Sequence, residues 1–123
     1  NINGVEISPL EFSSKILFNE WKLGDTEEEL TVMRITLKGA NEKGENKTIV
    51  YNLHDEYCAE TKTSSMARTT GYTATAAANM FLDGLFKEKG VFPPELFGKH
   101  EQCFKYVLNY LEERNVIYTL EES

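Results

Sequence analysis

Cationic charge and long apolar runs are both scarce in this sequence. Its 13 Lys and Arg stand against 20 Asp and Glu, which gives a net charge of -7. Because phosphate contacts require a clustered basic face and these cations are scattered, we expect no nucleic-acid binding. No apolar run approaches the roughly 20 residues that a transmembrane helix requires. We therefore expect no membrane span either.

Cysteine and histidine are scarce as well, with two of each. Cys58 and Cys103 lie far apart, and no metal-ligand pattern accompanies either of them. So few cysteines do not build a disulfide scaffold and are typical of reduced thiols in a cytoplasmic protein. His54 and His100 fit neither the HxxH nor the HExxH spacing of metal sites. The sequence thus predicts a cytoplasmic protein that binds no metal.

The common nucleotide-binding and hydrolase motifs are missing too. No GxGxxG follows a strand-like segment, and the chain has neither a P-loop nor a GxSxG. We therefore do not expect the chain to bind a dinucleotide by itself. The acid–base groups of residues 54–57 (His-Asp-Glu-Tyr) are adjacent, so their side chains point in different directions. An independent hydrolase is poorly supported, because no nucleophile, base and orienting group can be assembled.

The composition that remains is that of one globular domain. Hydrophobic residues make up 41% and charged residues 27% of the 123 positions, which is ordinary for a soluble domain with a single core. The chain starts at Asn1 without an initiator Met or a signal-peptide pattern. We therefore expect residues 1–123 to be a single domain excised from a longer chain.

Local patterns predict an α/β (α+β) fold. A capping box at residues 8–11 (Ser-Pro-Leu-Glu) starts a helix over residues 8–21, and Gly24 and Asp25 end it before a solvated acidic turn at residues 27–29. Residues 30–37 and 48–53 alternate as antiparallel strands, with Ile49, Tyr51 and Leu53 on the buried face. Residues 38–47 form a turn-rich loop between them.

The second half of the chain predicts helices and a closing strand. One helix runs from about residues 70–73 to 89 and stops at Gly90; its first half, residues 74–78, carries unusually small side chains. Residues 91–95 contain two prolines and form a rigid, non-helical connector. A further helix spans residues 99–114, and a strand follows over residues 116–120. We expect a mixed, mostly antiparallel sheet with helices packed on one face.

The segment over residues 64–73 (Ser-Ser-Met-Ala-Arg-Thr-Thr-Gly-Tyr-Thr) is the strongest candidate site. It places five Ser and Thr side chains and Arg68 at a helix start. Free N–H groups and a partial positive charge at that end favour a carboxylate or phosphate. The Arg68 guanidinium can hold a carboxylate bidentately. The alternative is plain N-capping, with Arg68 in an ion pair with one of the many acids of the chain.

Two motifs give the chain a resemblance to a known family. The first is residues 63–74, with Met-Ala-x-Thr-Thr-Gly at a helix start, and the second is Gly-Val-Phe-Pro-Pro-Glu at residues 90–95. In this order and separation they resemble the C-terminal portion of the saccharopine dehydrogenase family. The hairpin that precedes them, with Val-Met-Arg at residues 32–34, is also similar. The resemblance covers roughly residues 8–118.

The resemblance implies a part of an NAD(P)-dependent oxidoreductase. Family members act on the C–N bond of a secondary amine or imine in an amino-acid adduct; saccharopine reductases, carboxynorspermidine dehydrogenases and lysine 6-dehydrogenases belong here. By this resemblance, NAD or NADP would bind to a Rossmann domain outside this chain. The domain described by these motifs would line the substrate cleft and form a homodimer contact. Arg68, Thr69 and Thr70 are the substrate-binding candidates, and no catalytic or cofactor-binding residue is carried over.

A stand-alone, non-catalytic binding or dimerisation module is the competing hypothesis. Composition fits both hypotheses equally. They differ in the expected exposure of the small-sided helix face at residues 74–78. A part of a reductase should leave this face open, since a partner domain covers it in the whole enzyme, whereas a self-contained module should cover it.

Overall fold

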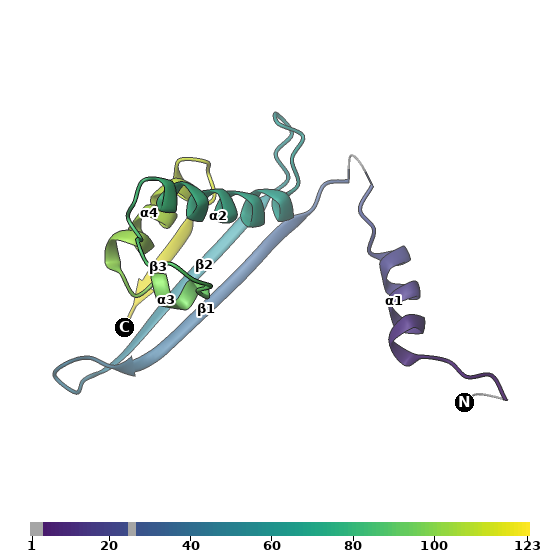
Figure 1. The fold of residues 1–123 in the computed structure, drawn as a ribbon, viewed down its shortest axis with the longest axis horizontal. Helices are drawn as coiled ribbons and strands as arrows, with labels where there is room; N and C mark the ends of the chain where they lie inside the picture. The colour runs from purple at the N-terminus through teal and green to yellow at the C-terminus, as the bar shows by residue number, and fades with distance from the viewer. Residues whose placement is uncertain (1–3, 25–26) are drawn as a thin grey trace.

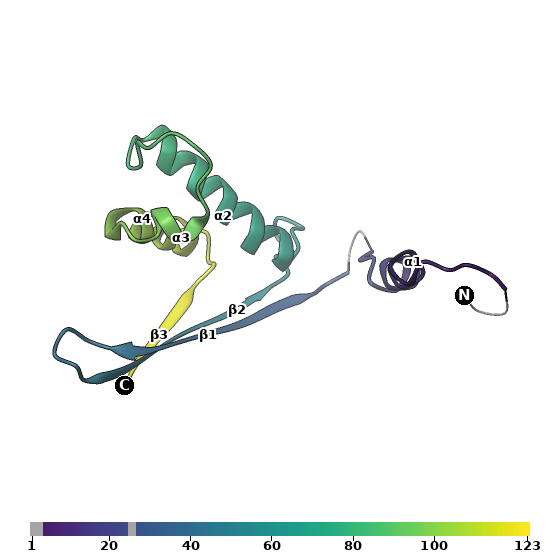
Figure 2. The ribbon, with the colours of Figure 1, turned by 60° about the horizontal axis from the view of Figure 1, so that its bottom comes forward.

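The computed structural model describes residues 4–24 and 27–123 as a three-stranded antiparallel sheet with helices on one face (Figures 1 and 2). This architecture confirms the predicted α+β class. The elements follow the order α1 (Pro9–Glu20), β1 (Leu30–Ala40), β2 (Asn46–Glu56), α2 (Ser65–Leu82), α3 (Pro94–Phe97), α4 (Glu101–Glu112) and β3 (Tyr118–Glu122).

The sheet consists of a long hairpin and one short strand. β1 pairs antiparallel with β2 from Leu30 opposite Glu56 to Ala40 opposite Asn46, and β3 pairs antiparallel with the other edge of β2. Both strands are longer than predicted, so the loop that joins them is shorter than the predicted residues 38–47. The Asn41 side chain accepts hydrogen bonds from the N–H groups of Lys43 (3.0 Å) and Glu45 (2.9 Å). This Asx turn closes the hairpin within residues 41–45.

One side of β2 carries the first part of the core. Leu53 is fully buried and clusters with Leu111 of α4 and Val116. Strand alternation places Ile49, Tyr51 and Leu53 on the helix-covered side, as predicted, but only Leu53 of the three is fully buried. The outer half of the hairpin extends past the helices (Figure 1), which leaves its side chains more exposed.

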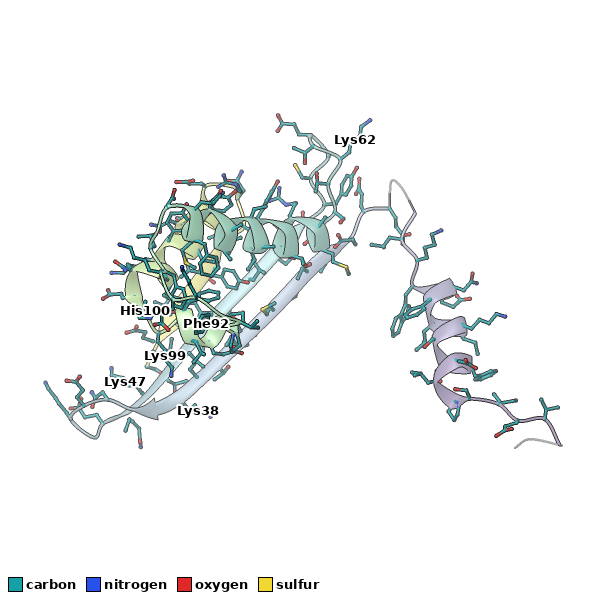
Figure 3. The ribbon with its side chains drawn as sticks, viewed as in Figure 1. Lys38, Lys47, Lys62, Phe92, Lys99 and His100 are labelled. Carbon is teal, nitrogen blue, oxygen red and sulfur yellow. The ribbon has the colours of Figure 1, made fainter. Side chains whose placement is uncertain are left out.

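A second cluster lies between the end of α2 and the start of α4. Met80, Phe86 and Cys103 are buried together, and Phe86 lies at its centre. Phe92 and His100, labelled in Figure 3, pack edge-to-face on the Phe86 ring with centroids at 5.3 and 5.6 Å. His100 thus contributes to packing at the start of α4.

Helix α2 differs most from the expectation. It begins at Ser65, because the Ser64 side chain accepts a hydrogen bond from the Ala67 N–H at 3.1 Å. It ends at Leu82, well before Gly90. Gly84 has a φ of +70°, and the N–H groups of Gly84 and Leu85 bond to the carbonyls of Phe81 and Met80. This is a Schellman motif, and it satisfies the last carbonyls of the helix at Gly84.

The proline connector contains a short helix, which corrects the expectation of an entirely non-helical segment. Pro94 occupies the first position of α3, where a missing N–H costs nothing. Helix α4 begins at Glu101, two residues later than predicted. Asn115 ends this region in the left-handed conformation with φ 58°, and β3 starts at Tyr118.

Helix α1 forms where predicted, but it does not pack on the domain. The Ser8 hydroxyl accepts a hydrogen bond from the Glu11 N–H at 3.4 Å. No residue of α1 is buried, and Figures 1 and 2 show the helix lying beyond the start of β1, apart from the sheet and the other helices. Gly24 follows the helix, and Asp25, its other predicted stop, lies outside the described residues.

A matched pair of glycine substitutions tests this account of α2. We expect Gly84→Ala to lower the free energy of unfolding by about 1–2 kcal/mol, because an L side chain is strained at its positive φ. Gly71→Ala, inside the same helix and with open space at its Cβ position, should raise it by about 0.5–1 kcal/mol. Urea unfolding followed by circular dichroism measures both. Equal effects of the two variants would contradict the Schellman assignment.

Candidate functional site

The start of α2 is bonded to the beginning of β1 and the end of β2. The buried Ser65 hydroxyl lies 3.0 Å from the Asp55 carbonyl oxygen and 2.8 Å from the Thr31 hydroxyl. The Met66 N–H donates to the Glu29 carboxylate at 2.9 Å. Glu29 therefore caps the helix, which corrects the expectation of a purely solvated acidic turn at residues 27–29. These contacts fix the helix start on the sheet.

Arg68 forms the ion pair at the centre of this junction. Its Nη2 donates to Asp55 Oδ1 at 3.1 Å, and its Nε lies 3.3 Å from both carboxylate oxygens. The two side chains are only 9% and 3% exposed. Nη2 also reaches the carbonyls of Arg114 (3.1 Å) and Asn115 (3.3 Å). Arg68 thus ties α2 to β2 and to the turn before β3.

The surroundings keep this guanidinium charged. The hydrogen bond to Asp55 raises the pKa of Arg68 above its usual value, despite the opposing effect of burial. The ring of Tyr72 lies 5.8 Å from the guanidinium carbon, within the range of a cation–π contact. The alternative interpretation of Arg68, an ion pair with one of the acids of the chain, describes this arrangement.

A cavity of about 590 Å³ lies next to this junction, between α2, β1 and the C-terminal helices. Thr69 and Thr70 line it, and Arg68 does not. Of the three predicted substrate-binding residues, the structure therefore brings two to the cavity wall. The remaining lining residues are mostly apolar or small: Met33, Thr73, Ala74, Ala77, Pro94, Phe97, Gly98, Cys103, Phe104, Val107 and Tyr118.

The polar groups of the cavity have defined hydrogen-bonding roles. The hydroxyls of Thr69 and Thr73 donate to the carbonyls of Ser65 (2.9 Å) and Thr69 (2.7 Å), one turn earlier in α2. Their oxygen lone pairs remain available as acceptors. Burial raises the pKa of Tyr118, so its phenol carries a proton near neutral pH. The cavity can thus offer both acceptors and a neutral donor.

The small-sided face of α2 is open. Ala74 and Ala78 are exposed and Ala77 is half-buried, whereas Ala76 points into the core. Ala74 and Ala77 belong to the cavity wall.

Other chemically active side chains do not assemble into a second site. His54 Nε2 lies 3.7 Å from Glu56 Oε1, and both side chains are largely exposed. A hydrogen bond from the Thr61 side chain lowers the pKa of the Cys58 thiol, and the charge of Arg68 acts weakly in the same direction. Over residues 4–24 and 27–123, no three His, Cys, Asp or Glu side chains come together as a metal would require.

No helix in the described part of the chain is both long and apolar enough to cross a lipid bilayer.

Comparison with known families identifies the domain. The saccharopine dehydrogenase C-terminal domain family matches residues 1–117. The chain belongs to this family. The match confirms the resemblance based on the two motifs, and it runs from before α1 to the residue before β3. The cavity and the ion pair therefore belong to a C-terminal domain of the saccharopine dehydrogenase type.

Several residues of the cavity were not recognised as site residues in the sequence. Phe104 and Val107 lie three residues apart in α4, and Met33 lies in β1, so each position by itself is typical of a core side chain. They converge on one cavity only through the way the helices lie over the sheet. Alternation along β2 places Asp55 on the same side as Leu53, which faces the helices, but it does not show which arginine Asp55 meets.

The ion pair can be tested in the 123-residue chain. Arg68→Ala would leave the Asp55 carboxylate buried without a counter-charge, so we expect a loss of about 3–5 kcal/mol in the free energy of unfolding. The double variant Arg68→Met/Asp55→Leu should recover part of this loss, because it removes both charges. Arg34→Ala, on an exposed arginine of β1, is the control and should change stability by about 0.5 kcal/mol or less. If Arg68→Ala and Arg34→Ala lowered the free energy of unfolding by similarly small amounts, the ion pair would not hold the fold.

Proposed function

We propose that this domain forms the substrate cleft of an NAD(P)-dependent oxidoreductase that acts on the C–N bond of an amino-acid adduct. The observation that carries the proposal is a largely apolar cavity of about 590 Å³ beside the Thr-rich half of α2, in a chain of this family. Its volume lies within the range of small-molecule sites, roughly 300–1,000 Å³. Saccharopine, carboxynorspermidine and lysine are candidate substrates.

The cavity wall suits such a substrate. The aliphatic part of an amino-acid adduct would contact Met33, Phe104 and Val107, and the hydroxyl oxygens of Thr69 and Thr73 would accept hydrogen bonds from its amine N–H groups. Thr70 is exposed and lines the cavity, so its hydroxyl can donate to a carboxylate. Arg68 is proposed as a positioning residue, because its ion pair fixes the turn of helix that carries both threonines.

The described sheet is not of the Rossmann type. A Rossmann unit needs parallel strands joined by crossover helices and a glycine-rich turn, whereas this sheet is antiparallel throughout. We propose that a separate Rossmann domain holds NAD or NADP, which supplies the hydride chemistry when bound. That domain would cover the open face of α2 at residues 74–78, and the domain described here would bind and orient the substrate.

Further parts of the proposal concern assembly and location. We propose that the whole enzyme is a homodimer of the cytoplasm, in keeping with the free Cys58 and Cys103.

The second candidate function is a stand-alone binding module. Saturable binding of saccharopine by the 123-residue chain alone, measured by calorimetry and abolished by Ala74→Leu, would favour that candidate.

A matched pair of variants in the full-length enzyme tests the cleft. Ala74→Leu adds three carbons to the cavity wall and should raise the KM for the amino-acid substrate about tenfold or more. Ala67→Leu, in the exposed first turn of α2 and outside both the cavity and the face at residues 74–78, should leave KM unchanged. The absorbance change as NAD(P)H is oxidised, or as it is formed from NAD(P), gives both KM values. Equal KM values in the two variants would place the substrate elsewhere.

The hydroxyl of Thr70 provides a finer test. Thr70→Val keeps the side-chain shape and removes one donor, so we expect KM to rise about fivefold, the value of a single hydrogen bond. Thr75→Val is the control, because the Thr75 hydroxyl bonds to Gly71 of its own helix at 3.0 Å and lies outside the cavity. A larger effect at Thr75 than at Thr70 would contradict the proposed orientation.

A further inference from the structure

The cavity beside α2 is lined without any charged side chain. None of the residues that line it in the described part of the chain is Asp, Glu, Lys, Arg or His. Its wall includes Cys103, which is fully buried, and the half-buried Val107. Tyr118 stays neutral, because burial raises the pKa of its phenol. An ion that entered this cavity would lose its water and find no counter-charge, which is strongly unfavourable.

Three N–H groups at the start of α2 already have partners within the chain. The Met66 N–H donates to the Glu29 carboxylate at 2.9 Å. The N–H groups of Ala67 and Arg68 donate to the hydroxyl and carbonyl oxygens of Ser64, at 3.1 and 3.0 Å. A helix N-terminus binds an anion through N–H groups that have no other partner. The anion site predicted at this helix start is therefore occupied by a carboxylate of the chain itself.

The guanidinium of Arg68 is neutralised as well. Its Nε and Nη2 bond to the carboxylate of Asp55, and Nη2 also reaches two main-chain carbonyls. The side chain is 9% exposed and does not line the cavity. A substrate carboxylate that displaced Asp55 would leave that acid buried without a counter-charge. Both groups that the sequence offers for a carboxylate thus already hold one of the acids of the chain.

The polar side chains that remain in the cavity are mainly hydroxyls near its opening. Thr70 and Thr73 are exposed, and the Thr73 hydroxyl donates to the Thr69 carbonyl at 2.7 Å. A carboxylate that bonded to Thr70 would stay at the surface of the domain, where water or a second domain can solvate it. The less exposed part of the wall includes side chains of carbon and sulfur alone: Ala77, Phe97, Cys103 and Val107.

We propose that the cavity binds only the uncharged methylene chain of an amino-acid adduct, and that the charged ends of the adduct lie outside it. The domain that covers α2 would then supply the cations that hold the carboxylates. Recognition by the domain described here depends on the length of the aliphatic chain and not on the sign of the charge at its end. This inference rests on the substrate cleft of the proposed function and specifies which part of the substrate the cleft recognises.

Straight-chain probes test this division of roles in the 123-residue chain. Hexanoate, hexylammonium and hexan-1-ol have the same length and differ in the charge at one end. At physiological ionic strength we expect their Kd values to agree within about threefold, because the end group stays in water and its charge is screened. Across butanoate, hexanoate and octanoate, each added methylene should lower Kd about fourfold, since it buries further apolar surface.

NMR of the alanine methyl groups locates the bound probe. The methyl signals of Ala74 and Ala77, which line the cavity, should shift on titration, whereas that of Ala67, which lies outside it, should not. Ala74→Leu fills part of the cavity and should raise the Kd of octanoate about tenfold. Ala67→Leu is the matched control and should leave this Kd unchanged. The spectra of both variants also report whether the domain is folded.

Two results would overturn the inference. One is hexanoate binding about tenfold more tightly than hexylammonium, with little dependence on chain length, because the cavity would then hold the carboxylate. The other is no shift of the Ala74 and Ala77 signals with millimolar octanoate. Neither result decides whether the substrate occupies the cavity in the whole enzyme, which the KM of the full-length Ala74→Leu enzyme tests separately.

Discussion

The buried ion pair between Arg68 and Asp55 is the contact on which the rest of the domain depends. It joins the first turn of α2 to the last residues of β2, and a second set of hydrogen bonds from Arg68 reaches the turn between α4 and β3. A buried carboxylate is stable only when a counter-charge and hydrogen bonds replace its water. The ion pair therefore fixes how α2 crosses the sheet.

The cavity follows from that crossing. Once α2 is held at its start, its small side chains at residues 73, 74 and 77 face β1 and the C-terminal helices without filling the space between them. Protein interiors are otherwise packed almost as densely as organic crystals. The space that remains is a largely apolar cavity beside three threonines. Under the proposed function, this cavity holds the substrate.

Two apolar surfaces lie outside the core, and they differ in character. The face of α2 at residues 74–78 is small-sided and continuous with the cavity, so it suits close approach of another domain. Helix α1 and the uncovered side of the sheet instead carry larger aromatic and aliphatic side chains. Large exposed apolar surfaces mark interaction sites.

The sequence by itself determined the family, the fold class, the hairpin and the start of α1. These follow from local signals: the capping box at Ser8, the alternation along two strands, and the two motifs that frame α2. Local signals also located Thr69 and Thr70 in the segment that lines the cavity. The end of α2 was missed although its signal is local, because Gly84 and Gly90 are both plausible stops and hydrogen bonds to Phe81 and Met80 select the first.

Only the tertiary structure decided the partner of Arg68, the shape of the cavity and the isolation of α1. The sequence offers 20 acidic residues, and spacing along the chain cannot show which of them meets a given arginine. Asp55 does so because antiparallel pairing and the helix crossing bring two positions together, 13 residues apart. The capping box likewise places α1, but only the folded structure shows that none of its residues is buried.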